Sequence, residues 1–198
     1  MTDPTPAIDP ERAALLVMDY QQAVVGMIDD SDALVARAAQ AIDLVRARGG
    51  HVGYVRVAVT DADLENIPPT SRMGARIAAG PQALHDDSPS TQIDERVASR
   101  NGDIIVRKTR VGAFSTTDLE QQLRKREITT LVLAGLSTSG VVLSTVREAM
   151  DRDYRIVVLR DACADRDAET HAFLTGTLFP HTAVVVDVAG LSGLWAVQ

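Results

Sequence analysis

The sequence lacks several features that would point to particular functions. It contains a single cysteine, Cys163, so an internal disulfide and a cysteine-rich zinc site are both excluded. No run of basic residues accompanies the net charge of −7, which argues against nucleic acid as a partner. No apolar stretch approaches the roughly 20 residues that cross a bilayer. We therefore expect no membrane association.

The first twelve residues carry three prolines and several acids ahead of any apolar run, the reverse of the order in a signal peptide. We expect an N-terminal tail over residues 1–12 and a cytoplasmic protein. Hydrophobic residues make up 45% of the 198 residues, which is enough for one hydrophobic core. The composition therefore favours a single domain over 1–198.

Short apolar runs alternate with longer segments of helical periodicity. Within each run the apolar residues follow one another instead of alternating with polar ones, as in parallel strands that are covered on both faces. They lie at residues 14–18, 51–59, 104–107, 130–134, 155–159 and 183–186. Helices are expected at 32–48, 116–126, 139–152 and 167–178. This alternation predicts an α/β fold with an open, mostly parallel sheet and helices on both faces.

One long segment, residues 61–102, departs from this alternation. It is rich in Pro, Asp, Ser and Gly, and we expect at most a short helix near 71–79. Loops of this length inside a compact domain are usually lids, binding loops or oligomer contacts. A flexible surface excursion is the alternative.

Polar residues follow the expected strands at the end of the sheet where ligands bind in such folds. Asp19 directly follows the first run, and Lys108 follows the third. A carboxylate that leaves a buried strand is partly desolvated, so its pKa tends upward unless a cation such as Lys108 compensates. An Asp–Lys pair in a cleft is typical of general acid–base chemistry, and a structural ion pair is the alternative.

Three segments that follow these strands resemble, in order, the motifs of the isochorismatase-like superfamily of cysteine hydrolases. Residues 14–21 are similar to the family's apolar strand ending in Asp-x-Gln. Residues 108–114 are similar to its lysine segment with a downstream Ala-Phe. Residues 135–149 are similar to its Gly-x-x-Thr-x-x-Cys-Val-x-x-Thr-x-x-x-Ala elbow. The resemblance extends over nearly the whole chain.

The resemblance implies a three-layer Rossmann-like sandwich with a six-stranded sheet and a Cys–Asp–Lys triad. In that family the thiol attacks an amide or ester carbonyl, the aspartate is its base, and the lysine tunes both. Backbone N–H groups of the elbow receive the oxyanion, often beside a non-proline cis peptide. A helix N-terminus lowers the pKa of a thiol and stabilises developing negative charge. Asp19 matches the base and Lys108 the lysine.

The third member of the triad does not carry over. Counting from Gly135 and Thr138, the nucleophile's position is Val141. An isopropyl group can neither attack nor ionise, so the covalent route is closed at this position. Shifting the alignment with the family motif does not supply a nucleophile, because Ser144 and Thr145 lie on the helix beyond the elbow.

Other residues are weak replacements for the missing nucleophile. We expect Cys163, after the fifth strand, to be a buried and inert thiol. Ser137, Thr138 and Ser139 lie in the elbow, but a hydroxyl needs an adjacent base to become nucleophilic. We expect these hydroxyls to bind the loop and cap the following helix, with Ser139 as the N-cap.

The residues expected to bind the substrate lie in the same three segments. They are Gln21, Arg110, Phe114, Leu136, Ser137, Thr138 and Gly140. Arg56 and Arg110 are candidates for a bidentate contact with a substrate carboxylate, with a structural salt bridge as the alternative. Nicotinamidase-like relatives hold a metal through an Asp-x-His segment near the second strand, and no histidine stands at that offset here. We therefore expect no metal and no other cofactor.

One branch of the superfamily works without the thiol. True isochorismatases, which cleave a vinyl ether, resemble this chain in keeping the aspartate and the lysine beside a non-nucleophilic residue. There the aspartate is thought to protonate the enol carbon, after which water captures the oxocarbenium ion. The present elbow departs from the Gly-Val-Tyr-Ala-His type of that branch, which argues against isochorismate itself as the substrate.

The sequence thus predicts a hydrolase that acts on a small polar or anionic molecule by Asp19/Lys108 acid–base chemistry. The alternative is a catalytically inactive family member that binds a small molecule or serves as an oligomerising domain. A third option is an amidase with a displaced nucleophile. The resemblance also implies a homo-oligomer, either a dimer or a tetramer.

Overall fold

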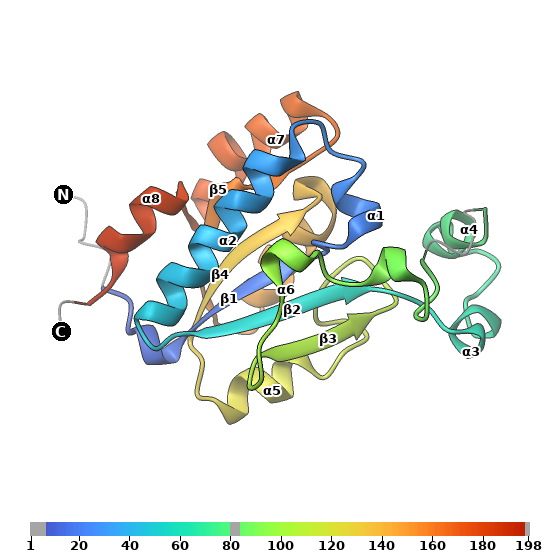
Figure 1. Ribbon diagram of the computed structural model, residues 1–198, viewed down its shortest axis with the longest axis horizontal. Coiled ribbons are helices and arrows are strands. Elements are labelled where there is room, and N and C mark those ends of the chain that lie inside the picture. Colours follow the sequence, from blue (N-terminus) through green and yellow to red (C-terminus); the bar gives the residue numbers. More distant parts are fainter. Residues whose placement is uncertain (1–6, 80–83, 197–198) are drawn as a thin grey trace.

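The computed structural model describes residues 7–79 and 84–196, without the side chains of residues 76–79. Six parallel strands form one sheet in the order β3-β2-β1-β4-β5-β6 (Figure 1). These strands are β1 (Ala13–Met18), β2 (His51–Val57), β3 (Ile104–Lys108), β4 (Thr130–Leu136), β5 (Arg155–Ala164) and β6 (Val184–Val186). The predicted α/β fold and the parallel sheet are confirmed.

Helices cover both faces of the sheet and make it the middle of three layers. On one face, α2 (Ser31–Ala47) and α8 (Val188–Leu191) pack their apolar side chains into a cluster with β1 and β5. On the other face, α5 (Leu119–Lys125) and α6 (Leu143–Met150) belong to a second cluster. Because the inner strands are covered on both sides, apolar side chains occupy successive positions along them, and all six residues of β1 are buried.

Helix α2 shows how the local sequence sets an element's limits. Its buried residues recur every three or four positions, which gives the helix one apolar face: they are Leu34, Val35, Ala38, Ala41, Ile42 and Val45. Beyond its end, Gly49 adopts a positive φ of 78°, a conformation that suits glycine. The predicted helix over 32–48 is confirmed.

The other predicted helices are present but begin or wind differently. Helix α5 begins at Leu119 rather than at 116, because Thr117 binds the carbonyl of Ala113 and accepts the N–H of Leu119 in the preceding turn. The helix predicted over 139–152 opens with a π-helical turn, Thr138–Val142, ahead of α6. Helix α7 (Ala168–Phe173) likewise continues into a π-helical turn, Leu174–Leu178.

The segment 61–102 contains more structure than the sequence predicted. Besides α4 (Arg72–Ala79), which matches the expected short helix, it forms α3 (Asp61–Glu65). The expectation of at most one helix was wrong, because a capping box between Thr60 and Asp63 starts α3. Asp63 also pairs with Arg107 at 2.6 Å, which ties α3 to the end of β3.

The predicted N-terminal tail is only partly a tail. Ile8 is 1% exposed and forms a β-bridge with Trp195, so the residues just before β1 pack against the C-terminal end of the chain. Residues 1–6 lie outside the described part. Within that part, no helix combines the length and the apolar character needed to cross a membrane.

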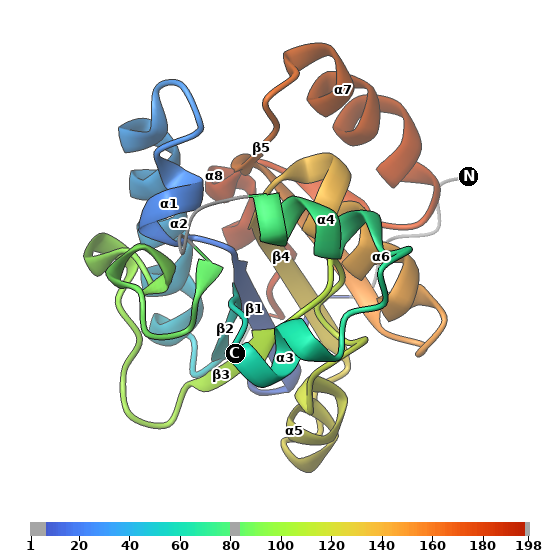
Figure 2. The same cartoon turned by 90° about the vertical axis from the view of Figure 1, so that its right-hand side faces the viewer.

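The carboxyl ends of the parallel strands meet at one edge of the sheet. Figure 2 looks onto this edge, with α3 and α4 in front of the sheet and with α1 (Gln22–Val25) and α7 on either side of it. Asp19, Lys108 and the elbow after β4 all come to this edge, where ligands bind in open α/β sheets.

Candidate active site

Asp19 and Lys108 form a buried ion pair at the ends of β1 and β3. The Lys108 Nζ lies 2.9 Å from Asp19 Oδ2, and the two side chains are only 2% and 8% exposed. Strand β2 separates β1 from β3, so the pair spans two strand spacings, or roughly 10 Å. The long lysine side chain bridges that distance, and its Nζ also donates to the carbonyl of Arg110 at 3.2 Å.

The backbone at Asp19 turns sharply out of the strand. Its φ is 59°, in the left-handed region that aspartate tolerates better than most residues. Its N–H still donates to the carbonyl of Val55 at 2.7 Å, so the turn begins directly at the last sheet hydrogen bond. Asp19 is thereby held rigidly at the sheet edge.

The electrostatic environment of Asp19 suits proton transfer near neutral pH. Burial raises the pKa of this carboxyl from 3.8 to about 6, although the charge and the hydrogen bond of Lys108 and, more weakly, the backbone N–H of Val57 oppose the rise. Its second oxygen, Oδ1, is buried and has no hydrogen-bond partner among the described residues. The site therefore holds one engaged and one uncommitted carboxylate oxygen.

Val141 lies in the π-helical turn that follows β4. It is 2% exposed and belongs to the same apolar cluster as Met18 and Phe114. The peptide bond between Leu136 and Ser137, directly before this turn, is cis. The turn thus holds two buried hydrocarbon side chains, Val141 and Val142, after the small residues Thr138, Ser139 and Gly140.

The cap of the elbow is Ser137 rather than Ser139, so that prediction was wrong. The Ser137 Oγ accepts the N–H of Gly140 at 3.1 Å, because the π-helical turn begins at Thr138, two residues before the start that a cap at Ser139 implies. A Cβ on Gly140 would lie 2.7 Å from this Oγ, so glycine leaves room for the cap. Ser139 is exposed, and its N–H donates to Asp165 Oδ2 at 2.7 Å.

Thr138 has the adjacent base that the sequence did not reveal. Its Oγ1 lies 2.8 Å from the Nδ1 of His171 on α7. Burial lowers the pKa of His171, so the imidazole is neutral near pH 7. However, Thr138 is completely buried, which keeps its hydroxyl from a substrate. The pair therefore fastens the elbow to α7.

Gln21 is engaged in holding the site together. Its Nε2 donates to the carbonyls of Val57 and Thr91, at 2.9 and 2.6 Å, and its Oε1 accepts the N–H of Val57 at 2.8 Å. Both amide donors are used, and the side chain is buried. Gln21 therefore joins the segment after β1 to two others: the end of β2, through Val57, and the long segment 61–102, through Thr91.

The remaining predicted binding residues surround the elbow at different depths. Phe114 is 5% exposed and stacks on Tyr154, with ring centroids 6.2 Å apart. Leu136 is buried in the cluster on the α2 face. Arg110 is half-buried, and its Nη1 donates to the neighbouring carbonyl of Thr109 at 2.8 Å. The backbone of Arg110 lies beside the ion pair, since its carbonyl accepts the ammonium of Lys108.

Arg56 takes part in a structural salt bridge. Its Nη2 lies 2.6 Å from Asp86, a residue of the long segment 61–102. Its other terminal nitrogen, Nη1, is buried without a hydrogen-bond partner among the described residues. This pair fastens the segment to the end of β2.

Cys163 has the environment of an inert thiol. It is 3% exposed, and burial raises its pKa to about 12, so the thiolate is not populated near neutral pH. The histidines are scattered over β2, the segment before β3, α7 and the turn before β6. In the described part of the chain, no three His, Cys, Asp or Glu side chains are grouped as metal ligands would be.

Comparison with known proteins agrees with this architecture. The family model for the isochorismatase domain matches residues 13–190. The uncharacterised isochorismatase family protein YwoC of Bacillus subtilis is 32% identical over 175 residues, which cover 87% of this chain and 88% of that protein. Ureidoacrylate amidohydrolase of Methylobacterium radiotolerans is 31% identical over 176 residues, covering 79% and 68%.

A solved structure shows the same fold. An isochorismatase family protein of Burkholderia thailandensis superposes with a TM-score of 0.81 at 28% identity, covering 96% of this chain and 98% of that one. The family model spans the sheet and the elbow, and the relatives align over most of their length. The chain therefore belongs to the isochorismatase family.

Proposed function

We propose that this protein is a hydrolase that acts on a small polar or anionic molecule by proton transfer at Asp19, without a covalent enzyme intermediate. The single observation that carries the proposal is the uncommitted Oδ1 of a buried carboxyl whose pKa is raised to about 6. A group with this pKa exchanges protons readily near neutral pH, as general acids and bases must.

Lys108 lets Asp19 act both as a base and as an acid in the proposed chemistry. When Asp19 is ionised, the ammonium at 2.9 Å stabilises the carboxylate and leaves Oδ1 as a base toward water. When Asp19 is protonated, Oδ1 can deliver the proton to a substrate atom. At pH 7 roughly a tenth of the carboxyl groups carry the proton, so neither form is rare.

The hydrocarbon at position 141 supports the non-covalent route. From the resemblance of residues 135–149 to the family elbow, we take Val141 to stand at the position of the nucleophilic cysteine. Neither Cys163 nor Thr138 replaces that thiol, since the thiol of Cys163 stays protonated and the hydroxyl of Thr138 is already bound to His171. In the proposed mechanism, water is therefore the group that attacks the substrate.

The name of the amidohydrolase relative guides the choice of substrates to test. Ureidoacrylate carries a carboxylate and a ureido group, and hydrolysis of a carbon–nitrogen bond suits a base that activates water. Arg110, half-buried and close to the elbow, is our candidate for the residue that binds the substrate carboxylate.

The test is turnover on isochorismate and on a panel of ureido acids, amides and esters. We compare the wild type with Asp19→Asn and with the matched control Asp43→Asn, which removes an exposed carboxylate of α2. Asp19→Asn should abolish turnover while Asp43→Asn leaves it unchanged. Undiminished turnover in Asp19→Asn, or a covalent adduct in intact-protein mass spectrometry, would contradict the proposal.

A second candidate function is a binding domain without catalysis. The observation that favours it is the depth of the site, because Asp19, Lys108 and Val141 are each no more than 6% exposed. Val141→Cys distinguishes the two. Gain of amidase turnover in this variant, with none on any substrate in the wild type, would favour the non-catalytic role.

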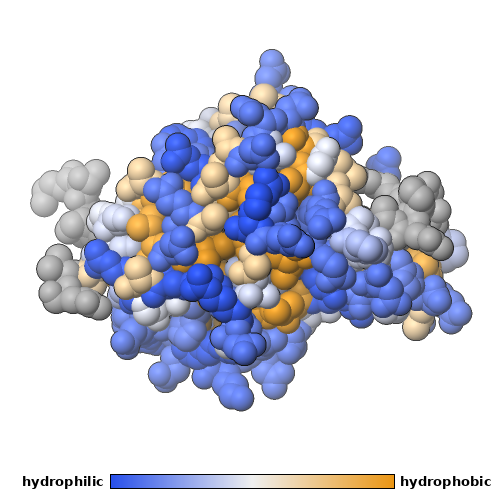
Figure 3. Space-filling model, viewed as in Figure 1, coloured by the Kyte–Doolittle hydropathy of each residue, from blue (hydrophilic) through white to orange (hydrophobic). Residues whose placement is uncertain are grey.

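Self-association stays a prediction. On the face shown in Figure 3, apolar residues reach the surface in patches between hydrophilic side chains. Met27 and Phe173 are 60% and 57% exposed, more than is usual for large apolar side chains. Light scattering that returns the mass of one chain would refute a dimer or a tetramer.

A further inference from the structure

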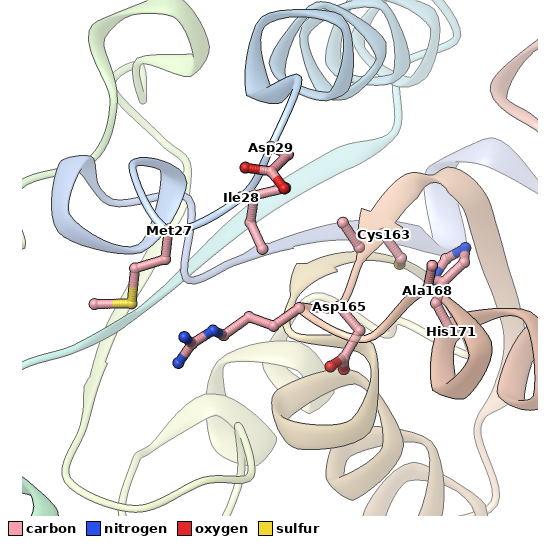
Figure 4. A pocket seen from close by; sticks show the side chains of 9 residues that line it. Met27, Ile28, Asp29, Cys163, Asp165, Ala168 and His171 are labelled. Carbon is pink, nitrogen blue, oxygen red and sulfur yellow. The ribbon is translucent and has the colours of Figure 1, made fainter.

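A cavity of about 540 Å³ lies beside the elbow, and the proposed chemistry does not use it. One wall comes from the segment after α1, including Met27, Ile28 and Asp29, and the other from the end of β5 and from α7 (Figure 4). Its volume falls within the range of small-molecule sites. Asp19, Lys108 and Val141 do not line it.

Two opposite charges line this cavity without a partner. Neither the carboxylate of Asp29 nor the guanidinium of Arg166 makes an ion pair or a hydrogen bond with any described side chain or backbone group. Both residues are exposed to solvent and they do not pair with each other, so they stand at the cavity as separate charges. Such an arrangement leaves room for a ligand between an anion site and a cation site.

Two other polar residues of the lining, Asp165 and His171, are held by contacts with neighbouring segments. Asp165 accepts the N–H of Ser139 at 2.7 Å, and the Nδ1 of His171 is bound to Thr138. The rest of the wall is apolar or small, with Met27, Ile28, Ala164 and Ala168 contributing hydrocarbon surface. The lining therefore offers the carboxylate of Asp29, the guanidinium of Arg166 and an apolar surface, beside the carboxylate of Asp165, which already accepts backbone N–H groups.

We propose that this cavity binds a small zwitterion, an amino acid with its ammonium and carboxylate separated by a short hydrocarbon spacer. The carboxylate pairs with Arg166, whose planar guanidinium can hold both oxygens. The ammonium pairs with Asp29, and the spacer packs on the apolar wall. A ligand with only one charge would leave the opposite wall charge unpaired, so the zwitterion has the better match.

The test is isothermal titration calorimetry of the full-length protein near pH 7. The probes are 3-aminopropanoate, 4-aminobutanoate and 6-aminohexanoate, which vary the spacer, together with butanoate and butylamine, which carry one charge each. We expect one of the amino acids to bind at least about tenfold more tightly than either single-charge probe.

Matched variants assign the two charges. Arg166→Gln and Asp29→Asn should each weaken binding of the preferred amino acid by about tenfold or more. The controls Arg147→Gln, on the exposed side of α6, and Asp30→Asn, next to Asp29 but outside the cavity lining, should leave affinity unchanged.

Three outcomes would overturn the proposal: no amino acid binds, a single-charge probe binds equally well, or either cavity variant keeps wild-type affinity. The inference stands apart from the proposed hydrolase function. Asp19 does not line the cavity, so Asp19→Asn should bind the amino acid as the wild type does even where turnover is lost.

Discussion

Replacing Lys108 by methionine should make the stability of the protein unusually dependent on pH. Lys108 is the cation that partly offsets the burial of Asp19, and its ammonium lies 2.9 Å from the carboxylate. Methionine keeps the apolar stem but removes the charge. The buried carboxyl then has no counterion, so its pKa should rise above the present value of about 6.

The sign follows from proton binding. Because the pKa of Asp19 is higher in the folded state than the unfolded value of 3.8, the folded state binds more protons between these values. The stability that this carboxyl contributes is complete below about pH 4 and is lost as pH rises to about 6. In the wild type this loss amounts to about 3 kcal/mol, after which it stays constant.

In Lys108→Met the loss should continue above pH 6. If the pKa of Asp19 rises to about 8, within the range known for buried carboxyl groups, the variant loses about 2 kcal/mol more than the wild type between pH 5 and pH 8. Urea unfolding at these two pH values measures the difference. Removing the ion pair will also lower the free energy of unfolding by an amount that does not depend on pH, and this part will be the same at pH 5 and pH 8.

The control is the same substitution in the Asp19→Asn background. Without a titrating carboxyl, Lys108→Met should shift stability by nearly the same amount at pH 5 and pH 8. The reasoning fails if the single variant shows no excess loss at pH 8, or if the excess persists in the Asn background.

Two further predictions concern buried groups outside the ion pair. Gln21→Leu should lower the free energy of unfolding by about 3 kcal/mol, because it leaves buried backbone groups of Val57 and Thr91 without partners, and urea unfolding will detect this loss. A change below about 1 kcal/mol would mean that water replaces the amide. Cys163 should react with iodoacetamide far more slowly in the native protein than in urea, because its pKa is about 12 and it is 3% exposed. Equal rates by mass spectrometry would contradict that environment.

The strands could be predicted because their sequence pattern is local. A parallel strand covered by helices on both faces needs apolar side chains at successive positions, and residues 14–18 and 130–134 meet that requirement. The edge strand β3 shows the limit of the rule, since its Ile105 is 48% exposed. The short helix α3 was missed because its start depends on a capping contact rather than on an apolar repeat.

The candidate site could be predicted in part. Asp19 and Lys108 could be singled out because each is the polar residue at the end of an apolar run, where parallel strands converge. The hydrogen bonds of Gln21 to Val57 and Thr91, and the one between Thr138 and His171, could not be predicted in the same way. Both contacts join segments far apart in the sequence, and nothing in the local pattern of either segment indicates the other.

The sequence by itself determined the order of strands and helices, the family, and the presence of a hydrocarbon side chain at position 141. Each of these follows from residue types at short and regular spacings. Only the tertiary structure decided which polar groups meet: the 2.9 Å contact across β2, the cap at Ser137, and the unpaired charges of Asp29 and Arg166 on one cavity. Those contacts depend on the order and register of strands in the sheet, and a difference of one residue there turns a side chain to another face.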